Sequence, residues 1–278
     1  MSSKTTATFR TLPALIAIYS AARFCFSQRT FTTTAKTFNL LEGFLGGGGQ
    51  RSGGSDQIMS VHGAAPYVIK PSGKHTATLF FFHGLGDQGA GWADVFRSEI
   101  VIPHLKVVCP NAGVRPVTLN FGMAMPAWYD LFGLSASSPE DVPGIQKATE
   151  YVHGLIEAEI KEGIPAEKIF VGGFSMGGAL AIYAGLTYDK PLGGLVGLSS
   201  FLLQRDKLPG NHTANLKTPV FLGHGTNDFL VPLQFGQLTK DAIAKFNPNI
   251  ELKTYPMDHS SCPQELRDVK DFLNKNLK

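Results

Sequence analysis

Cysteine is scarce in this chain, and its few positions form no recognisable pattern. Among 278 residues there are three cysteines, Cys25, Cys109 and Cys262, and none belongs to a Cys-x-x-Cys pair. Small secreted domains held together by disulfides need paired cysteines at short, regular spacings. An odd number at irregular spacing instead favours a reduced compartment.

Metal-binding patterns and a basic body are also absent. The eight histidines form neither His-Glu-x-x-His nor His-x-His, so we expect neither a metal site nor another cofactor. Residues 1–58 carry six basic and two acidic side chains, whereas residues 59–278 carry 19 basic and 20 acidic ones. Because the body of the chain is nearly neutral, a nucleic-acid partner is not expected.

Residues 1–42 contain no acidic side chain before Glu42 and are rich in serine, threonine, alanine, arginine and phenylalanine. This bias is typical of a mitochondrial transit peptide, so we expect a targeting-like extension that directs import into mitochondria or another organelle. A second interpretation takes residues 12–19 as a signal-peptide core, because Lys4 and Arg10 precede this apolar run and small residues follow it. The run is shorter than the ~20 residues that span a bilayer. The third is a disordered extension without an address, on a cytoplasmic protein with at most peripheral membrane contact.

Residues 43–58 include four consecutive glycines and are predicted to form a flexible linker, because the backbone entropy of glycine opposes both helix and strand. We therefore expect one catalytic domain over residues 59–278.

Apolar runs and helical periodicities alternate along that domain. Residues 77–82 form a continuous apolar run that predicts a strand buried on both faces, and residues 144–161 repeat apolar side chains at three- and four-residue steps. We expect further strands near 67 and at 106–109, 168–172, 195–198, 220–222 and 250–255, and further helices at 179–186, 233–246 and 264–277. The alternation predicts an α/β fold with a mostly parallel central sheet and helices on both faces. Functional groups in such sheets gather at the carboxyl ends of the strands.

Ser175 lies in the run Gly173-Phe174-Ser175-Met176-Gly177, directly after one predicted strand and before a predicted helix. A Gly-x-Ser-x-Gly run in that context holds the serine in a strained turn with its hydroxyl exposed. A serine that merely caps the helix is the structural alternative. The strand, the helix and both glycines together favour a nucleophile.

A serine nucleophile needs a histidine to take its proton and an acid to orient that histidine, in the chain order Ser, Asp or Glu, His for this type of fold. Asp228 follows the strand at 220–222, and His259 follows the strand at 250–255. We expect these two residues to complete the triad. His224 comes too early, in the loop that carries the acid, and is expected to pack in that loop. Asp258 is a rival acid, but adjacent residues in an extended segment point apart.

Two further groups of residues are candidates around the serine. The backbone amides of Leu85, in the loop His83-Gly84-Leu85-Gly86, and of Met176 are placed to stabilise an oxyanion. Apolar residues in loops near the strand ends, Phe132, Leu134 and Leu230, are candidates for lining an acyl-chain pocket.

The body of the chain resembles the acyl-protein thioesterases of the lysophospholipase/carboxylesterase type, which have the α/β-hydrolase fold. The matching stretches are FFHGLGDQGAGW (81–92), PNAGVRPVTLNFGMAMPAWYDLFGLS (110–135), VGGFSMGGALAIYAGL (171–186), HGTNDFLVPLQFG (224–236) and HSSCPQE (259–265). The resemblance implies the same triad and oxyanion donors. It also implies hydrolysis of S-palmitoyl cysteine on proteins, with S-acylated proteins and lysophospholipids as substrates.

Three features depart from that family pattern. Met176 stands where similar proteins commonly have glutamine, the segment 201–213 is shorter than its usual counterpart, and Ser2 replaces the cysteine found near the start of familiar members. Two other functions remain as alternatives to the thioesterase. One is a broad carboxylesterase or lysophospholipase, and the other is an inactive module that binds acyl chains, which would require a broken triad.

Overall fold

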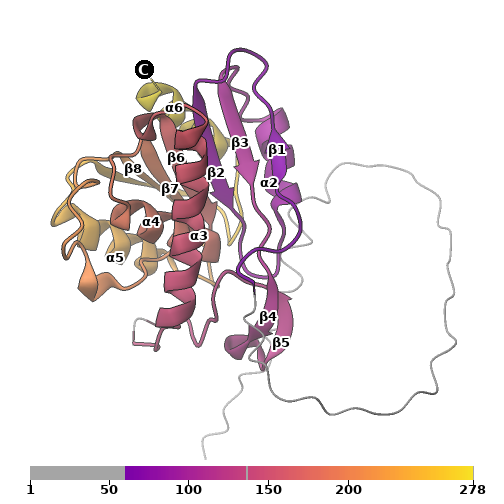
Figure 1. The fold of residues 1–278 in the computed structure, drawn as a ribbon. Coiled ribbons are helices and arrows are strands. Elements are labelled where there is room, and N and C mark those ends of the chain that lie inside the picture. The colour runs from indigo at the N-terminus through magenta and orange to yellow at the C-terminus, as the bar shows by residue number, and fades with distance from the viewer. Residues whose placement is uncertain (1–59, 136, 278) are drawn as a thin grey trace, which may run out of the picture.

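The computed structural model describes residues 60–135 and 137–277 (Figure 1). The predictions made for residues 1–42 and 43–58 lie outside this range. The described chain forms a central sheet with helices packed on both of its faces.

The sheet has seven strands in the order β1-β3-β2-β6-β7-β8-β9. β1 pairs with β3 in the antiparallel direction, and every other neighbouring pair is parallel. Parallel pairing buries both faces of the inner strands, which explains why β2 is a continuous apolar run. The strands are β1 (Tyr67–Ile69), β2 (Ala77–Phe82), β3 (Leu105–Cys109), β6 (Ile169–Phe174), β7 (Gly194–Leu198), β8 (Val220–Gly225) and β9 (Ile250–Tyr255).

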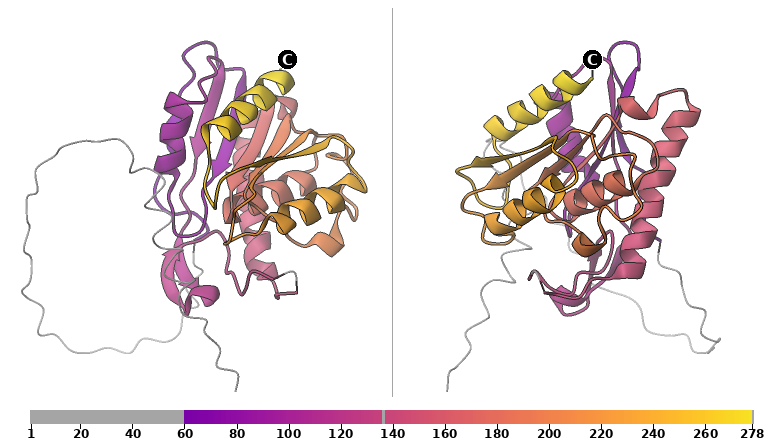
Figure 2. Two further views of the ribbon diagram at one scale, coloured as in Figure 1. Left: turned by 180° about the vertical axis from the view of Figure 1, so that it is seen from behind. Right: turned by 90° about the vertical axis from the view of Figure 1, so that its left-hand side faces the viewer.

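The helices divide between the two faces of the sheet (Figure 2). Side chains alternate along β2, so Leu79 and Phe81 pack under α2 and α6 while Phe80 and Phe82 face the opposite core. That opposite core is covered by α3, α4 and α5. The prediction of a mostly parallel sheet with helices on both faces is therefore confirmed. The helices are α2 (Gly89–Ser98), α3 (Val142–Lys161), α4 (Met176–Thr187), α5 (Leu233–Ala244) and α6 (Pro263–Asn276).

Local signals set where the helices begin. Asp141 caps α3 by accepting a hydrogen bond from the Gly144 N–H at 3.0 Å, and Pro143 stands in the first turn, where its missing N–H costs nothing. The helix thus begins two residues before the predicted position. α6 likewise begins with a proline, Pro263.

Helix α2 and a small second sheet were missed by the sequence interpretation. Helix α2 opens with Gly89 and Gly91, which disfavour helix, although Trp92, Val95 and Phe96 show the spacing of a buried stripe. The second is a two-stranded sheet formed by β4 (Val114–Val117) and β5 (Met123–Pro126). Half of its residues are exposed, and each strand contains a proline, Pro116 or Pro126, which disfavours strand in the sequence.

The arrangement brings the ends of β6, β8 and β9 to one edge of the sheet. The β4–β5 hairpin extends from the body near this edge (Figure 1). No helix in the described part of the chain is long and apolar enough to cross a bilayer.

Candidate active site

Ser175 occupies the turn between β6 and α4 in a backbone conformation that few residues adopt, with φ of 53° and ψ of −121°. The turn is possible because glycines flank it. A Cβ on Gly173 would lie 2.4 Å from the carbonyl carbon of Gly177, and a Cβ on Gly177 would lie 2.3 Å from the carbonyl oxygen of Phe82. The strained turn presents the serine hydroxyl at the carboxyl end of the sheet.

His259 links Ser175 to Asp228. Its Nε2 lies 3.0 Å from Ser175 Oγ, and its Nδ1 lies 2.7 Å from Asp228 Oδ2. With a proton on Nδ1, the imidazole donates to the carboxylate and leaves Nε2 free to accept from the serine hydroxyl. The three side chains, which lie far apart in the sequence, therefore form one hydrogen-bonded series.

Asp228 is held firmly by the loop that follows β8. Its side chain is buried, and its Oδ1 accepts hydrogen bonds from the backbone N–H groups of Leu230 at 3.0 Å and Val231 at 2.8 Å. These donors stabilise the carboxylate away from water and aim its second oxygen at His259.

The neighbouring candidates take other roles. Asp258 is exposed, and its carboxylate accepts a hydrogen bond from Ser260 Oγ at 2.6 Å. His224 is buried, with Nε2 2.8 Å from the carbonyl oxygen of Val231, and burial lowers its pKa. It lies within β8 and not in the acid-bearing loop as predicted, but it packs against that loop through Val231.

Leu85 and Met176, the two candidates for oxyanion donors, both line the cleft that contains Ser175. Met176 is the first residue of α4, so its N–H has no acceptor within the helix. The loop that carries Leu85 lies directly against the nucleophile, since a Cβ on Gly84 would contact the Cβ of Ser175 at 3.4 Å. The side chain of Met176 is buried in the core. The methionine at this position, where similar proteins commonly have glutamine, therefore exposes no apolar side chain to solvent.

His83 ties the Leu85 loop to the rest of the domain. Its Nε2 accepts a hydrogen bond from the Ala112 N–H at 3.0 Å, and its Nδ1 lies 2.8 Å from the carbonyl oxygen of Gly84. Trp128 Nε1 donates to the carbonyl oxygen of His83 at 2.9 Å. Burial lowers the pKa of His83 to about 4, so the imidazole is neutral and can donate from one nitrogen while accepting at the other. Sequence reasoning gave this histidine no role.

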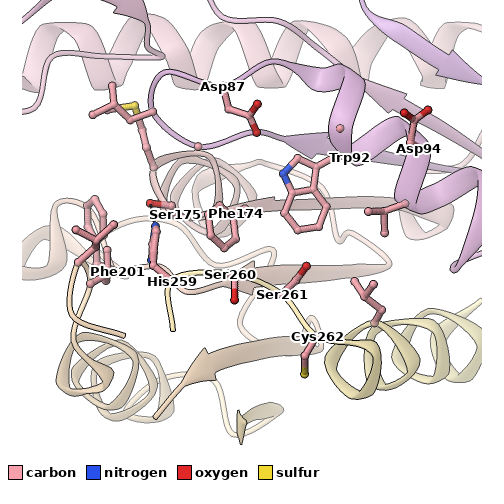
Figure 3. A pocket seen from close by; sticks show the side chains of 18 of the residues that line it. Asp87, Trp92, Asp94, Phe174, Ser175, Phe201, His259, Ser260, Ser261 and Cys262 are labelled. Carbon is pink, nitrogen blue, oxygen red and sulfur yellow. Dashed lines mark hydrogen bonds between the residues drawn. The ribbon is translucent and has the colours of Figure 1, made fainter. Parts of the chain in front are cut away.

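The cleft beside Ser175 has a volume of about 360 Å³ and extends to both sides of Ser175 and His259 (Figure 3). Two of the predicted acyl-pocket residues, Leu134 and Leu230, line it. Phe132 does not, because it lines an adjoining cavity that does not reach Ser175. Other apolar residues of the cleft were not nominated from the sequence, among them Leu119, Phe201 and Trp92. Within the described residues, no group of three or more histidine, cysteine, aspartate or glutamate side chains is arranged to hold a metal ion.

A seven-stranded, mostly parallel sheet, with Ser175 in a strained strand-to-helix turn after β6, is the arrangement of the α/β-hydrolase fold. Comparison with known proteins agrees with this class, since residues 64–277 match the model of the Phospholipase/Carboxylesterase family. The chain belongs to that family.

Within that family, the chain is similar to several acyl-protein thioesterases. The chain is 40% identical to acyl-protein thioesterase 1 of Neurospora crassa over 224 residues, which are 76% of this chain and 91% of the relative. It is 44% identical to acyl-protein thioesterase 1 of Mycosarcoma maydis over 229 residues, which are 75% and 95% of the two chains. The crystal structure of Zea mays acyl-protein thioesterase 2 superposes with a TM-score of 0.70 at 32% identity, covering 77% of this chain and 99% of the maize chain.

Proposed function

We propose that this protein is a serine hydrolase that removes long acyl chains from S-acylated cysteines of proteins through an acyl-enzyme on Ser175. The observation that carries the proposal is the position of His259, in hydrogen-bond contact with both Ser175 and Asp228 at the floor of a largely apolar cleft. The relatives named acyl-protein thioesterase 1 support the thioester as the bond that is cleaved.

The reaction begins with the attack of Ser175 Oγ on the thioester carbonyl while His259 Nε2 takes the hydroxyl proton. The positive charge that develops on the imidazole is stabilised by Asp228, which also holds the tautomer with a proton on Nδ1. The oxyanion accepts hydrogen bonds from the amides of Leu85 and Met176. As the carbonyl reforms, the cysteine sulfur leaves and receives the proton from His259.

Water then completes the cycle. His259 accepts a proton from the water that attacks the acyl-serine ester, and a second oxyanion forms at the same amides. Its collapse releases the fatty acid and returns the proton to Ser175 Oγ. One histidine thus serves both half-reactions, and no cofactor takes part.

The test uses a palmitoylated cysteine peptide and a fluorophosphonate probe. The wild-type protein should release free thiol from the peptide and be labelled by the probe, while Ser175→Ala should do neither. Labelling of Ser175→Ala would show that another residue is the reactive nucleophile.

A broader esterase or lysophospholipase is the second candidate, and the description of the matching family as Phospholipase/Carboxylesterase favours it. Both activities use the same Ser175 chemistry and differ in the leaving group. Comparing kcat/KM for a palmitoyl thioester, a lysophospholipid and a short nitrophenyl ester separates them. Hydrolysis of the short ester alone would favour the second candidate.

For cellular location we propose organelle import, on the composition of residues 1–42 alone. A fusion of residues 1–58 to a fluorescent protein tests this. A diffuse cytosolic signal would favour the alternative of a cytoplasmic protein with peripheral membrane contact.

A further inference from the structure

The cleft extends to both sides of Ser175, and its two halves belong to opposite faces of the sheet. Leu119, Leu131 and Phe201 line one half and pack against the core under α3, α4 and α5. Trp92 and Leu266 line the other half and belong to the core under α2 and α6. Figure 3 shows Phe201 and Trp92 on opposite sides of Ser175 and His259. The nucleophile therefore stands at the boundary between two arms.

The two arms differ in chemistry. The first, here called the acyl arm, is lined only by apolar side chains: Leu119, Leu131, Leu134, Phe201, Leu230 and Val231. The second, here called the α2–α6 arm, combines Trp92 and Leu266 with polar and acidic side chains from α2, the loop before it and the loop before α6. Its acids are Asp87, Asp94 and Glu99, and its hydroxyls are Ser98, Ser260 and Ser261.

The charge of the α2–α6 arm is negative and only partly compensated. Asp94 pairs with Arg97, whose Nη1 lies 2.6 Å from Asp94 Oδ1. Asp87 and Glu99 have no ion-pair partner within 4.0 Å among the residues that the structure describes. No lysine or arginine of the described chain lines this cleft.

A thioester also has two halves, which meet at the carbonyl carbon that Ser175 attacks. When that carbon lies beside Ser175 Oγ, one half of the substrate occupies each arm. Moving a hydrocarbon chain from water into the acyl arm lowers the free energy. A polypeptide is better matched by the polar groups of the α2–α6 arm.

We propose that the α2–α6 arm binds the polypeptide that carries the acylated cysteine and prefers segments with lysine or arginine beside that cysteine. This inference rests on the proposed thioesterase function and adds the leaving-group side of the specificity. The acyl arm selects the chain, and the α2–α6 arm selects the protein segment by Coulomb attraction to Asp87 and Glu99.

The experiment compares three peptides that carry the same S-octanoyl cysteine, flanked by lysines, alanines or glutamates. At low ionic strength the wild-type protein should show a kcat/KM for the lysine peptide about threefold to tenfold above that for the alanine peptide, with the glutamate peptide below both. Salt at about 0.5 M should bring the three values together, since it screens exposed charges. Equal values for all three peptides at low salt would overturn the inference.

Variants locate the effect. The double variant Asp87→Asn/Glu99→Gln should reduce the lysine-to-alanine ratio to about one, because it removes the two uncompensated charges. Glu251→Gln is the control for loss of a negative charge outside the cleft, since Glu251 is exposed on β9 and does not line the cleft; it removes one charge where the double variant removes two. A lysine preference that persists in the double variant, or is lost equally in Glu251→Gln, would contradict the assignment to this arm.

The octanoyl thioester of N-acetylcysteamine separates failure of the inference from failure of the proposed function. It carries the acyl chain and the thioester but no flanking residues. If it is cleaved and the peptides show no charge preference, the thioesterase function stands and the α2–α6 arm proposal is wrong. If neither it nor any peptide is cleaved while an octanoyl oxygen ester is, the thioesterase function is wrong and the inference falls with it.

Discussion

The ring of Phe174 packs against the imidazole of His259, with ring centroids 4.7 Å apart and planes at 48°. The opposite neighbour of Phe174 is Trp92, at 5.6 Å between centroids. Phe174 thus separates the α2 side of the cleft from the histidine and restricts how the imidazole can tilt. The residue immediately before the nucleophile therefore also positions the proposed base.

Phe174→Ala should lower kcat about tenfold with a smaller change in KM. Without the Phe174 ring against it, the imidazole of His259 should spend less time aligned with Ser175 Oγ. Phe174→Tyr keeps the ring and should retain most of the activity. Steady-state kinetics with a palmitoyl thioester measure the effect, and thermal unfolding shows whether the alanine variant is folded. An unchanged kcat in folded Phe174→Ala would argue against a positioning role.

His83→Asn should slow the reaction by displacing the loop that carries the Leu85 amide. The variant loses the acceptor for the Ala112 N–H, and an unpaired buried donor costs about 1–3 kcal/mol of stability. We expect kcat to fall about tenfold, as for a weakened oxyanion site. A variant that loses stability but keeps the wild-type kcat would show that His83 supports only the fold.

His83 also makes the stability of the domain depend on pH. Burial holds its folded-state pKa at about 4, below its usual value of 6.5, so the unfolded chain takes up this proton first. Its contribution is present above pH 6.5 and is lost as the pH falls from 6.5 to about 4, by about 3 kcal/mol in all. Urea unfolding at pH 7 and pH 5 should show a smaller loss in His83→Asn than in the wild type, and equal losses would contradict this.

Glu265 acts in the opposite direction. Its side chain is fully buried beside Gly223, neither carboxyl oxygen has a hydrogen-bond partner among the described residues, and burial raises its pKa to about 8. The raised pKa means that its proton stabilises the folded state at low pH, and this stability is lost as the pH rises from 4.5 to about 8.

Glu265→Gln removes the titrating group and should raise the free energy of unfolding at pH 8 by about 4 kcal/mol. Near pH 4.5 the two proteins should be nearly equally stable, since the wild-type carboxyl is then neutral. Urea denaturation across this range provides the test. A gap between the two proteins that does not change with pH would mean that Glu265 is charged in the folded state.

Leu134→Trp should shorten the preferred acyl chain. Leu134 lines the acyl arm, so added volume there should lower kcat/KM for palmitoyl relative to octanoyl thioesters about tenfold. Phe132→Trp is the matched control, because Phe132 faces the adjoining cavity. If both variants change the chain-length ratio equally, the acyl chain does not lie where we place it.

The sequence predicts the parallel sheet and the positions of Ser175, Asp228 and His259 because each of these residues follows a predicted strand. The strands before Ser175 and Asp228 are apolar runs, whereas the strand before His259 mixes apolar and polar residues. Such runs are local signals, and the fold then brings their ends to one edge. Chain order alone does not separate Asp228 from Asp258, since both lie between Ser175 and His259; Asp228 is preferred because adjacent residues such as Asp258 and His259 point apart in an extended segment.

The lining of the cleft was predicted less well. Leu119 and Phe201 are separated by a long stretch of sequence and come together only through loop packing, which leaves no periodic pattern to read. Trp92 was missed because Gly89 and Gly91 obscure helix α2. Phe132 lines the adjoining cavity and not the cleft, since adjacent loop residues point to different sides and only the structure shows which of them faces Ser175.

The central claim, an acyl-enzyme on Ser175 formed from a protein thioester, can be tested by quenching the reaction with acid within the first turnover. The wild-type protein, mixed with a palmitoyl-cysteine peptide, is digested and analysed by mass spectrometry. We predict a palmitoyl adduct on the peptide that contains Ser175, formed together with one equivalent of released thiol and absent in Ser175→Ala. Thiol release without any adduct, or an adduct on another residue that persists in Ser175→Ala, would contradict the account.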